Sequence, residues 1–189
     1  MARVEWTISN VLTVARILLL IPILYLLLDL DNGNRLYAAA FMLVVALTDF
    51  LDGSLARRFH QETEFGKIID PLADKICAGA VVIALAALGD LPAWFMIALI
   101  GRDALILLGG LYIAKTKNVV LHSNWAGKVA MGVVAAFLIV ATLRFGALEA
   151  AELILLWGSV GFLGLSFVLY CKRFYQAVLA KPQLIEPSP

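Results

Sequence analysis

Apolar residues fall into six long runs along this chain, and polar and charged residues gather between them. The runs cover about residues 11–28, 36–56, 65–88, 93–114, 125–143 and 151–174. About 20 helical residues are needed to cross a hydrocarbon core of about 30 Å, and each run is close to that length. The pattern therefore predicts an all-α integral membrane protein with six transmembrane helices.

The connections between the runs are short and contain residues that break helices. Two of them are turns, Asp31-Asn32-Gly33-Asn34 and Gly89-Asp90-Leu91-Pro92. No connection is long enough to hold a soluble domain. We therefore expect one membrane domain over residues 1–180, and a disordered tail over residues 181–189.

Composition supports the membrane assignment. Hydrophobic residues make up 62% of the chain, against about 45–50% in typical soluble proteins. Only 15% of residues are charged, and the mean hydropathy is +0.93. The net charge of +1 says little by itself, because the position of the charges matters more than their sum. We expect the lipid bilayer to surround the chain, and we expect no nucleic-acid partner.

The distribution of cations predicts the orientation in the membrane. Lysine and arginine concentrate at both termini and in the second and fourth connections, whereas the first and fifth hold only Arg35 and Arg144. Cytoplasmic loops are enriched in these residues. We therefore expect a multi-pass protein of the cell membrane, with both termini on the cytoplasmic side.

Polar residues also mark the start of the first run. Asn10, Thr13 and Arg16 recur every three residues, so they share one face of a helix. They fit either a capped helix start with an arginine that reaches the interface, or a polar face turned towards a cytoplasmic substrate cavity.

Four aspartates stand out at the cytoplasmic ends of the second and third runs. Asp49 and Asp52 are three residues apart, and Asp70 and Asp74 are four apart, so each pair occupies one face of a helix. The short connection predicts that the two helices pack antiparallel. Both pairs should then lie at the same cytoplasmic depth and face each other.

Four carboxylates in a low-dielectric site need protons, cationic partners or metal ions. Oxygen ligands without histidine or cysteine suit Mg²⁺ or Mn²⁺, and two such ions can clamp a phosphoryl group. The alternative is a set of structural ion pairs with neighbouring cations, namely Arg57, Arg58, Lys67 and Lys75. Two same-face pairs on adjacent helices are more than such a network needs, so we favour a site for two divalent cations.

Small residues lie beside the aspartates. Gly53, Ala56 and Gly66 would let a ligand approach the helix backbone, or would let the helices pack closely. Arg57 and Lys67 border the same region, where they could contact phosphates or serve as cytoplasmic surface charges. Because these residues alternate with the aspartates, we favour a pocket.

The segment between Asp49 and Asp74 reads Asp-x2-Asp-Gly-x2-Ala-Arg-x8-Gly-x3-Asp-x3-Asp. This pattern resembles the signature of the CDP-alcohol phosphotransferase family at every fixed position. Residues 9–16, Ser-Asn-Val-Leu-Thr-x2-Arg, resemble the N-terminal element of the same family.

The resemblance implies transfer of a substituted phosphate from a CDP-linked donor to an alcohol, with release of CMP. It implies Asp49, Asp52 and Asp70 as the main ligands of Mg²⁺ or Mn²⁺, with Asp74 as a further ligand and the general base. It also implies a homodimer. The implied donor-binding residues are Asn10, Thr13, Asp49, Gly53, Ala56, Arg57 and Gly66.

Within the family, residues 70–75 and 123–129 are similar to members that join CDP-diacylglycerol to glycerol 3-phosphate. The acceptor phosphate would need cations, and we expect Arg102 and Lys128 to supply them. Lys67 and Arg16 are the next candidates. Arg102-Asp103 is closer to members that use phosphatidylglycerol as acceptor. Arg102 has a second interpretation, as the partner of Asp103 or of a motif aspartate in an ion pair.

Three other classes of function remain open at this stage. A lipid synthase with a different acceptor would use the same metal site. A cation or proton transporter would use the aspartates as a conduction path, but would need charged groups on several helices. A non-catalytic scaffold would tolerate loss of Asp70.

Overall fold

The computed structural model describes residues 8–29, 32–59, 66–117 and 125–179. The side chains of residues 8–14, 49–59 and 66–74 lie outside the described part. The described residues form six α-helices and one short 3-10 helix, η1. Their bounds are α1 Ile8–Leu28, α2 Asn32–Phe59, α3 Gly66–Ala87, α4 Ala93–Lys117, α5 Trp125–Leu143, η1 Gly146–Leu148 and α6 Glu149–Leu179.

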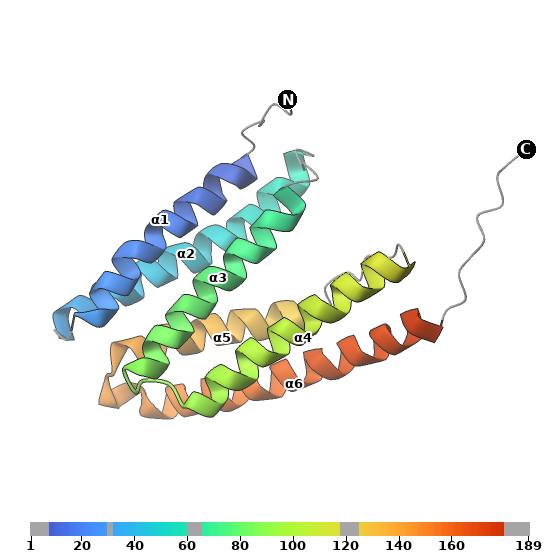
Figure 1. Cartoon of the computed structure of the whole chain (residues 1–189). Coiled ribbons are helices and arrows are strands. Elements are labelled where there is room, and N and C mark those ends of the chain that lie inside the picture. Colours follow the sequence, from blue (N-terminus) through green and yellow to red (C-terminus); the bar gives the residue numbers. More distant parts are fainter. Residues whose placement is uncertain (1–7, 30–31, 60–65, 118–124, 180–189) are drawn as a thin grey trace, which may run out of the picture.

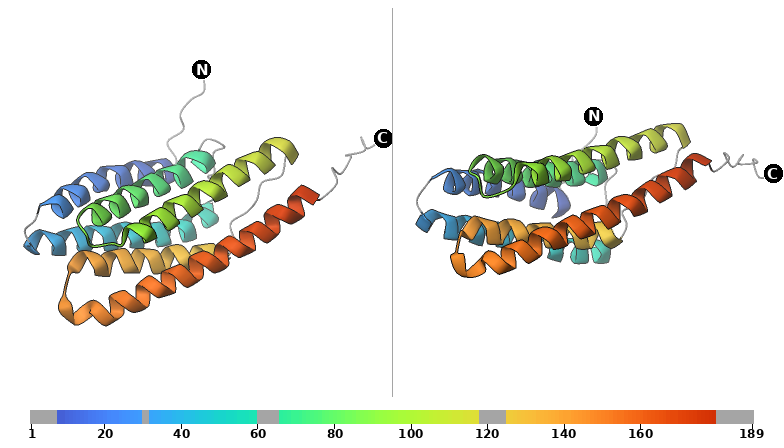
Figure 2. Two further views of the ribbon diagram at one scale, coloured as in Figure 1. Left: turned by 60° about the horizontal axis from the view of Figure 1, so that its bottom comes forward. Right: turned by 90° about the horizontal axis from the view of Figure 1, so that it is seen from below.

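The six helices form a closed ring of neighbours. Helix α1 packs against α2 and α3, α4 packs against α3 and α6, and α5 packs against α2 and α6. Figure 2 shows the same arrangement as two layers, with α1, α3 and α4 in one and α2, α5 and α6 in the other. Successive helices run in opposite directions along the bundle (Figure 1).

The alternating directions give the bundle two distinct ends. We call the end that holds the C-terminus of α2 and the N-termini of α1 and α3 the aspartate end (Figure 1). The C-termini of α4 and α6 lie at the same end. The opposite end, where α3 turns into α4 and α5 turns into η1 and α6, is the far end.

The predicted all-helical class and the number of helices are confirmed. Within the described residues, α4, α5 and η1–α6 contain segments long and apolar enough to cross a membrane: Ala93–Ile113, Trp125–Leu143 and Gly146–Leu179. The described parts of α1, α2 and α3 contribute shorter apolar stretches: Ala15–Leu28, Asn34–Thr48 and Lys75–Ala87.

The first predicted turn is wrong in its position. Helix α2 begins at Asn32, so Asn32, Gly33 and Asn34 belong to its first turn rather than to a loop. The Asn34 side-chain amide donates a hydrogen bond to a carboxylate oxygen of Asp29 (2.8 Å), which joins the two helix ends. Helix α6 also continues five residues beyond the predicted end at Phe174. The predicted tail lies outside the described residues.

The second predicted turn is confirmed, and glycine explains it. Gly89 has a φ of +79°, a left-handed conformation that residues with a Cβ adopt at a cost. Its N–H bonds the carbonyl of Ala86, and the Asp90 N–H bonds that of Leu85. This pair of bonds is a Schellman cap, which ends α3 and turns the chain into α4.

Among the described side chains, the buried apolar core lies towards the far end. It combines residues of every helix, including Leu27, Met42, Leu85, Phe95, Phe137 and Leu163. The Phe95 and Phe137 rings meet edge-on with their centroids 5.2 Å apart. The far-end halves of the helices are therefore held together by ordinary apolar packing.

Large apolar side chains also cover the outer surface, and aromatic ones lie near both ends of the bundle. Trp94 and Trp157 are exposed towards the far end, with ring centroids 6.2 Å apart. Tyr112 and Tyr175 are exposed towards the aspartate end. Residues 94 and 112 are separated by about 27 Å along α4 at the usual helical rise. Two aromatic belts about one hydrocarbon thickness apart are typical of a membrane-embedded bundle.

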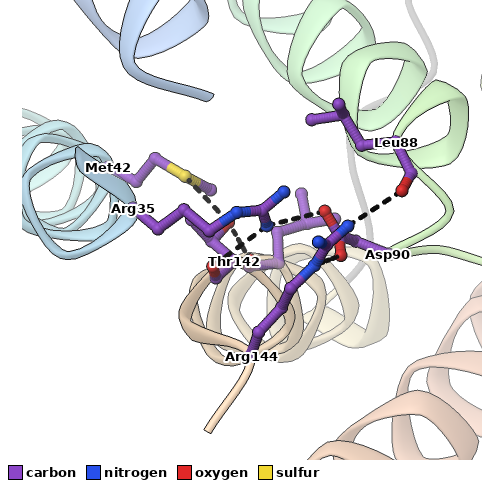
Figure 3. Close-up of polar contacts among 7 residues, drawn as sticks. Arg35, Met42, Leu88, Asp90, Thr142 and Arg144 are labelled. Atoms are coloured by element: carbon purple, nitrogen blue, oxygen red, sulfur yellow. Dashed lines mark hydrogen bonds and ion pairs between the residues drawn. The ribbon is translucent and has the colours of Figure 1, made fainter. Parts of the chain in front are cut away.

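A buried ion cluster closes the far end (Figure 3). Arg35 of α2 is 1% exposed, and its Nη1 lies 2.7 Å from Oδ2 of Asp90 in the turn after α3. Arg144, which follows α5, pairs with Oδ1 of the same carboxylate. Arg144 also donates to the Leu88 carbonyl at 2.8 Å, and Arg35 donates to the Thr142 carbonyl at 3.4 Å. One aspartate thus joins α2, α5 and the α3–α4 turn.

Arg35 and Arg144 are not the isolated cations that the sequence alone suggests. Both pair with the single carboxylate of Asp90, which offsets one of their two positive charges. The net positive charge of these residues at the far end is therefore small, and the charge asymmetry between the two ends remains.

Gly109 makes close packing of α4 against α6 possible. A Cβ at this position would lie 2.8 Å from the Tyr170 hydroxyl, which donates to the Ile106 carbonyl at 2.8 Å. Gly109→Ala is expected to break that bond and to destabilise the protein by about 1–3 kcal/mol, as overpacking does. Thermal unfolding of the purified protein in detergent would measure the effect.

The matched control for Gly109→Ala lies on the same helix. A Cβ at Gly101 meets no atom within 4 Å, so Gly101→Ala should leave the melting temperature unchanged or raise it slightly. Equal melting temperatures for both variants would contradict the proposed role of the Gly109–Tyr170 contact.

Candidate active site

Both pairs of aspartates lie within continuous helix. Helix α2 runs through Asp49 and Asp52 to its end at Phe59, and α3 runs through Asp70 and Asp74 from its start at Gly66. The spacings of three and four residues therefore place each pair of positions on one helical face. The four side chains themselves lie outside the described residues.

The helix bounds also bring the two pairs to a comparable level. At the usual helical rise, Asp49 and Asp52 lie about 15 and 10 Å from the C-terminus of α2. Asp70 and Asp74 lie about 6 and 12 Å from the N-terminus of α3. Both of those helix termini are at the aspartate end (Figure 1). The backbone thus allows the four carboxylates to gather at one depth.

Helix α1 completes this end of the bundle. It packs against both α2 and α3, and its N-terminal part lies at the aspartate end (Figure 1). Arg16 is half-buried on α1, and the positions of Thr13 and Asn10 are about one and two turns before it. The side chains of Asn10 and Thr13 lie outside the described residues.

The other predicted donor-site residues are also helical. Gly53, Ala56 and Arg57 lie in the last turns of α2. Gly66 and Lys67 open α3. Their side-chain environments lie outside the described part of the chain, so their roles stay predictions.

A polar contact links α3 to α4 beside the last aspartate. Nζ of Lys75 lies 3.7 Å from Oδ2 of Asp103 and 3.4 Å from its backbone carbonyl. Because Lys75 directly follows Asp74, this contact places the middle of α4 close to the depth of Asp74. The sequence had suggested Lys75 only as a partner for the motif aspartates.

Arg102 is held at the same level, between α4 and α6. Its side chain is 14% exposed, and Nη1 lies 2.6 Å from Oδ1 of Asp103. Nη2 donates to the Ser166 hydroxyl at 2.5 Å. The ion pair with Asp103, which was one of the two interpretations of Arg102, is therefore present.

The ion pair does not use the full hydrogen-bonding capacity of Arg102. A guanidinium carries five N–H donors, and the Nε donor of Arg102 is buried without a partner. A buried donor without a partner costs about 1–3 kcal/mol. Nε and an adjacent Nη form the edge that binds carboxylates and phosphates with two parallel bonds. Arg102 thus retains an unused donor, Nε, for an anion.

Lys128 does not take part in the described contacts of Arg102. It is exposed on the first turn of α5, at the aspartate end of the bundle (Figure 1). Its role as an acceptor-binding residue stays a prediction.

The metal site can be tested only by the chemistry of its donors. Among the described residues, no three or more His, Cys, Asp and Glu side chains group so that they could hold a metal ion. The four motif aspartates would supply carboxylate oxygens alone, which fit Mg²⁺ or Mn²⁺. The residues present are therefore suitable for the predicted ions.

Sequence reasoning missed Ser166. It is 1% exposed on α6, and it accepts the hydrogen bond from Arg102 described above. Its sequence signal is weak: Ser159 and Ser166 are the two serines of α6, two turns apart in the apolar middle of that helix. Only the packing of α4 against α6 shows that Ser166, and not Ser159, lies beside Arg102.

Comparison with protein-family models gives one match, to the model described as CDP-alcohol phosphatidyltransferase, over residues 6–165. The match covers most of the chain and includes both aspartate pairs, Arg102 and Lys128. The chain belongs to the CDP-alcohol phosphatidyltransferase family. The resemblance found in the motif is thereby confirmed.

Named relatives within this family are 34–36% identical to the chain over the aligned segments. A "Probable phosphatidylglycerophosphate synthase" of Mycobacterium tuberculosis is 35% identical over 126 residues, which cover 65% of this chain and 59% of that protein. A "CDP-diacylglycerol--glycerol-3-phosphate 3-phosphatidyltransferase" of Mycoplasma genitalium is 36% identical over 138 residues, 64% of this chain and 58% of that protein. A Bacillus subtilis protein of the same name is 34% identical over 137 residues, 66% and 70% of the two chains.

The chain thus matches about three fifths of the length of the first two relatives. The family assignment rests on the family model, which spans residues 6–165.

Proposed function

We propose that this protein transfers the phosphatidyl group of CDP-diacylglycerol to glycerol 3-phosphate, which gives phosphatidylglycerophosphate and CMP. The observation that carries the proposal is the complete family motif on two helices, α2 and α3, whose motif-bearing parts lie at the same end of the bundle. The names of the relatives from M. tuberculosis, M. genitalium and B. subtilis support the choice of substrates.

The donor would bind at the aspartate end. Two divalent cations held by Asp49, Asp52, Asp70 and Asp74 would neutralise the pyrophosphate and stabilise charge on the attacking and leaving oxygens. Gly53, Ala56 and Gly66 leave the helix backbone open to the cytidine. Further polar contacts to the donor would come from Arg57, Asn10 and Thr13.

The acceptor hydroxyl would then attack the β-phosphorus in line with the departing CMP. The bond from the β-phosphorus to the bridging oxygen breaks, and the hydroxyl proton passes to Asp74 as general base. The contact between Lys75 and Asp103 supports this position for the acceptor, because it brings α4 close to Asp74.

Arg102 would bind the phosphate of glycerol 3-phosphate. Its buried, unpartnered Nε supports this role, and an arginine in the middle of a membrane helix is a functional candidate by default. Lys128, Lys67 and Arg16 would add positive charge around the same anion.

We further propose that all six helices cross the membrane, with both termini and the aspartate end on the cytoplasmic side. Cations gather in the connections at the aspartate end, whereas Arg35 and Arg144 at the far end are paired with Asp90. The soluble substrate glycerol 3-phosphate would then enter from the cytoplasm. A homodimer is the expected assembly.

An acceptor screen tests the proposed reaction. Purified protein receives CDP-diacylglycerol with Mg²⁺ or Mn²⁺ and one of several alcohols, and CMP release is followed. Glycerol 3-phosphate is expected to give the highest kcat/KM, because its phosphate can accept from the unpartnered Nε of Arg102. Glycerol, which lacks the phosphate, is the matched control and should react at least about 100-fold less efficiently.

The other results identify the competing functions. CMP release with phosphatidylglycerol alone would favour cardiolipin formation, for which the dipeptide Arg102-Asp103 is the supporting feature. No CMP with any alcohol would refute the enzyme assignment and leave cation transport or a scaffold role. Cation flux into proteoliposomes would then separate those two.

A further inference from the structure

Arg102 can bind an acceptor phosphate well only if its guanidinium is held in one orientation. An arginine side chain has about 2 kcal/mol of rotamer entropy, so a free one would lose much of its binding energy on being ordered. In this structure the guanidinium is held from two sides, by Asp103 of its own helix and by Ser166 of α6.

The two contacts leave the Nε donor of the guanidinium unused. Asp103 occupies Nη1 and Ser166 occupies Nη2, while Nε is buried without a partner. Asp103 is in turn fixed by Lys75, next to Asp74. Among the described residues, the Ser166 hydroxyl is the contact that joins Arg102 to a different helix, so it fixes how the guanidinium is rotated between α4 and α6.

We infer that Ser166 is a positioning residue of the acceptor site: it holds Arg102 so that the Nε edge receives the phosphate of glycerol 3-phosphate. The inference rests on the proposed function. Ser166 lies just beyond the segment matched by the family model, which ends at residue 165. The positioning role is therefore inferred from the contact between Arg102 and Ser166 in this protein, and not from the family match.

The expected signature is a selective change in the acceptor KM. Ser166→Ala removes the hydroxyl and leaves Arg102 held by Asp103 of its own helix, without the contact to α6. We expect the KM for glycerol 3-phosphate to rise about tenfold, as for loss of one hydrogen bond to a charged group. The KM for CDP-diacylglycerol and kcat should stay within about twofold, because the donor site is not touched.

The chain offers a matched control on the same helix. Ser159 is also fully buried on α6, but its hydroxyl has no hydrogen-bond partner. Ser159→Ala removes the same atoms without disturbing Arg102, so all kinetic constants should match those of the wild type. Ser166→Thr, which keeps a hydroxyl, should restore most of the acceptor affinity.

A double-mutant cycle tests whether Ser166 acts through Arg102. Arg102→Ala should raise the acceptor KM by about 100-fold or more, because a charged phosphate contact is lost. Adding Ser166→Ala to Arg102→Ala should then change nothing further. Additive effects would overturn the inference.

Two further results would also overturn it. One is an unchanged acceptor KM in Ser166→Ala while the wild type releases CMP with glycerol 3-phosphate. The other is an equal rise in the KM values of both substrates together with a lower melting temperature, which would mean a purely structural role. If the alanine variant does not fold, Ser166→Cys keeps the volume with a weaker acceptor and is expected to raise the same KM. A wild type that releases no CMP would instead refute the proposed function.

Discussion

Asp70→Asn is expected to reduce CMP release by about 10³-fold or more, since metal stabilisation of the transferring phosphoryl group is worth several kcal/mol. Asparagine keeps the size of the side chain but removes its charge, so α3 should still form. The measurement is the initial rate of CMP release from CDP-diacylglycerol and glycerol 3-phosphate, with saturating Mg²⁺.

Asp29→Asn is the matched control for this charge removal. Asp29 is exposed just after α1, at the far end, and its contact is the hydrogen bond from Asn34. Its loss should change the rate by less than about twofold, because a surface contact of this kind is weak. An Asp70→Asn variant as active as the wild type would contradict the metal-dependent mechanism and favour a scaffold.

Metal removal gives an independent check of the same site. Chelation with EDTA should abolish CMP release, and either Mg²⁺ or Mn²⁺ should restore it, because an all-carboxylate site binds both. The Asp70→Asn variant should need a higher metal concentration for any residual rate. Full activity in EDTA would contradict the proposal.

The helices could be predicted from the sequence because membrane helices obey a strong rule. Every backbone polar group in lipid must be satisfied internally, so each apolar run of about 20 residues becomes a helix. The turn at Gly89 was predictable for a local reason, the left-handed conformation that glycine allows. The turn at Asn32–Asn34 was misplaced, since polar residues at a helix start resemble a loop in sequence.

The aspartate pairs were predictable because their spacing alone places them on helical faces. The contacts of Arg102 with Ser166, and of Asp90 with Arg35 and Arg144, were not. They join residues between 54 and 64 positions apart, as set by the packing order of the helices. Hydrophobic patterning defines which residues form each helix, but it does not define which helix is its neighbour.

The ion cluster at the far end yields the second large effect. Asp90→Ala is expected to destabilise the protein by about 3–5 kcal/mol, because it leaves Arg35 charged and buried without its partner. The Arg35 and Asp90 side chains are only 2% and 3% exposed, so water cannot replace the lost carboxylate without opening the bundle. Chemical unfolding of the detergent-solubilised protein, followed by helical circular dichroism, measures the change.

The two arginines should differ in the same experiment. Arg144 is 43% exposed, so its pair with Asp90 is partly screened by solvent, and Arg144→Ala should cost about 1 kcal/mol or less. Arg35→Ala should cost several times more, because it removes the buried partner of the Asp90 carboxylate and leaves a cavity. Similar losses for both variants would mean that the cluster is hydrated.

Replacing the buried pair as a unit separates charge burial from packing. Asp90→Ala with Arg35→Met removes both charges and keeps an apolar side chain against Met42 and Thr142, which lie beside Arg35 (Figure 3). Because a lone buried charge costs more than an absent pair, the double variant should recover most of the stability lost in Asp90→Ala. Catalytic constants should remain near those of the wild type, since the cluster lies at the end of the bundle opposite the aspartates. A double variant as unstable as Asp90→Ala alone would show that the carboxylate acts by fixing the α3–α4 turn, and not by neutralising Arg35.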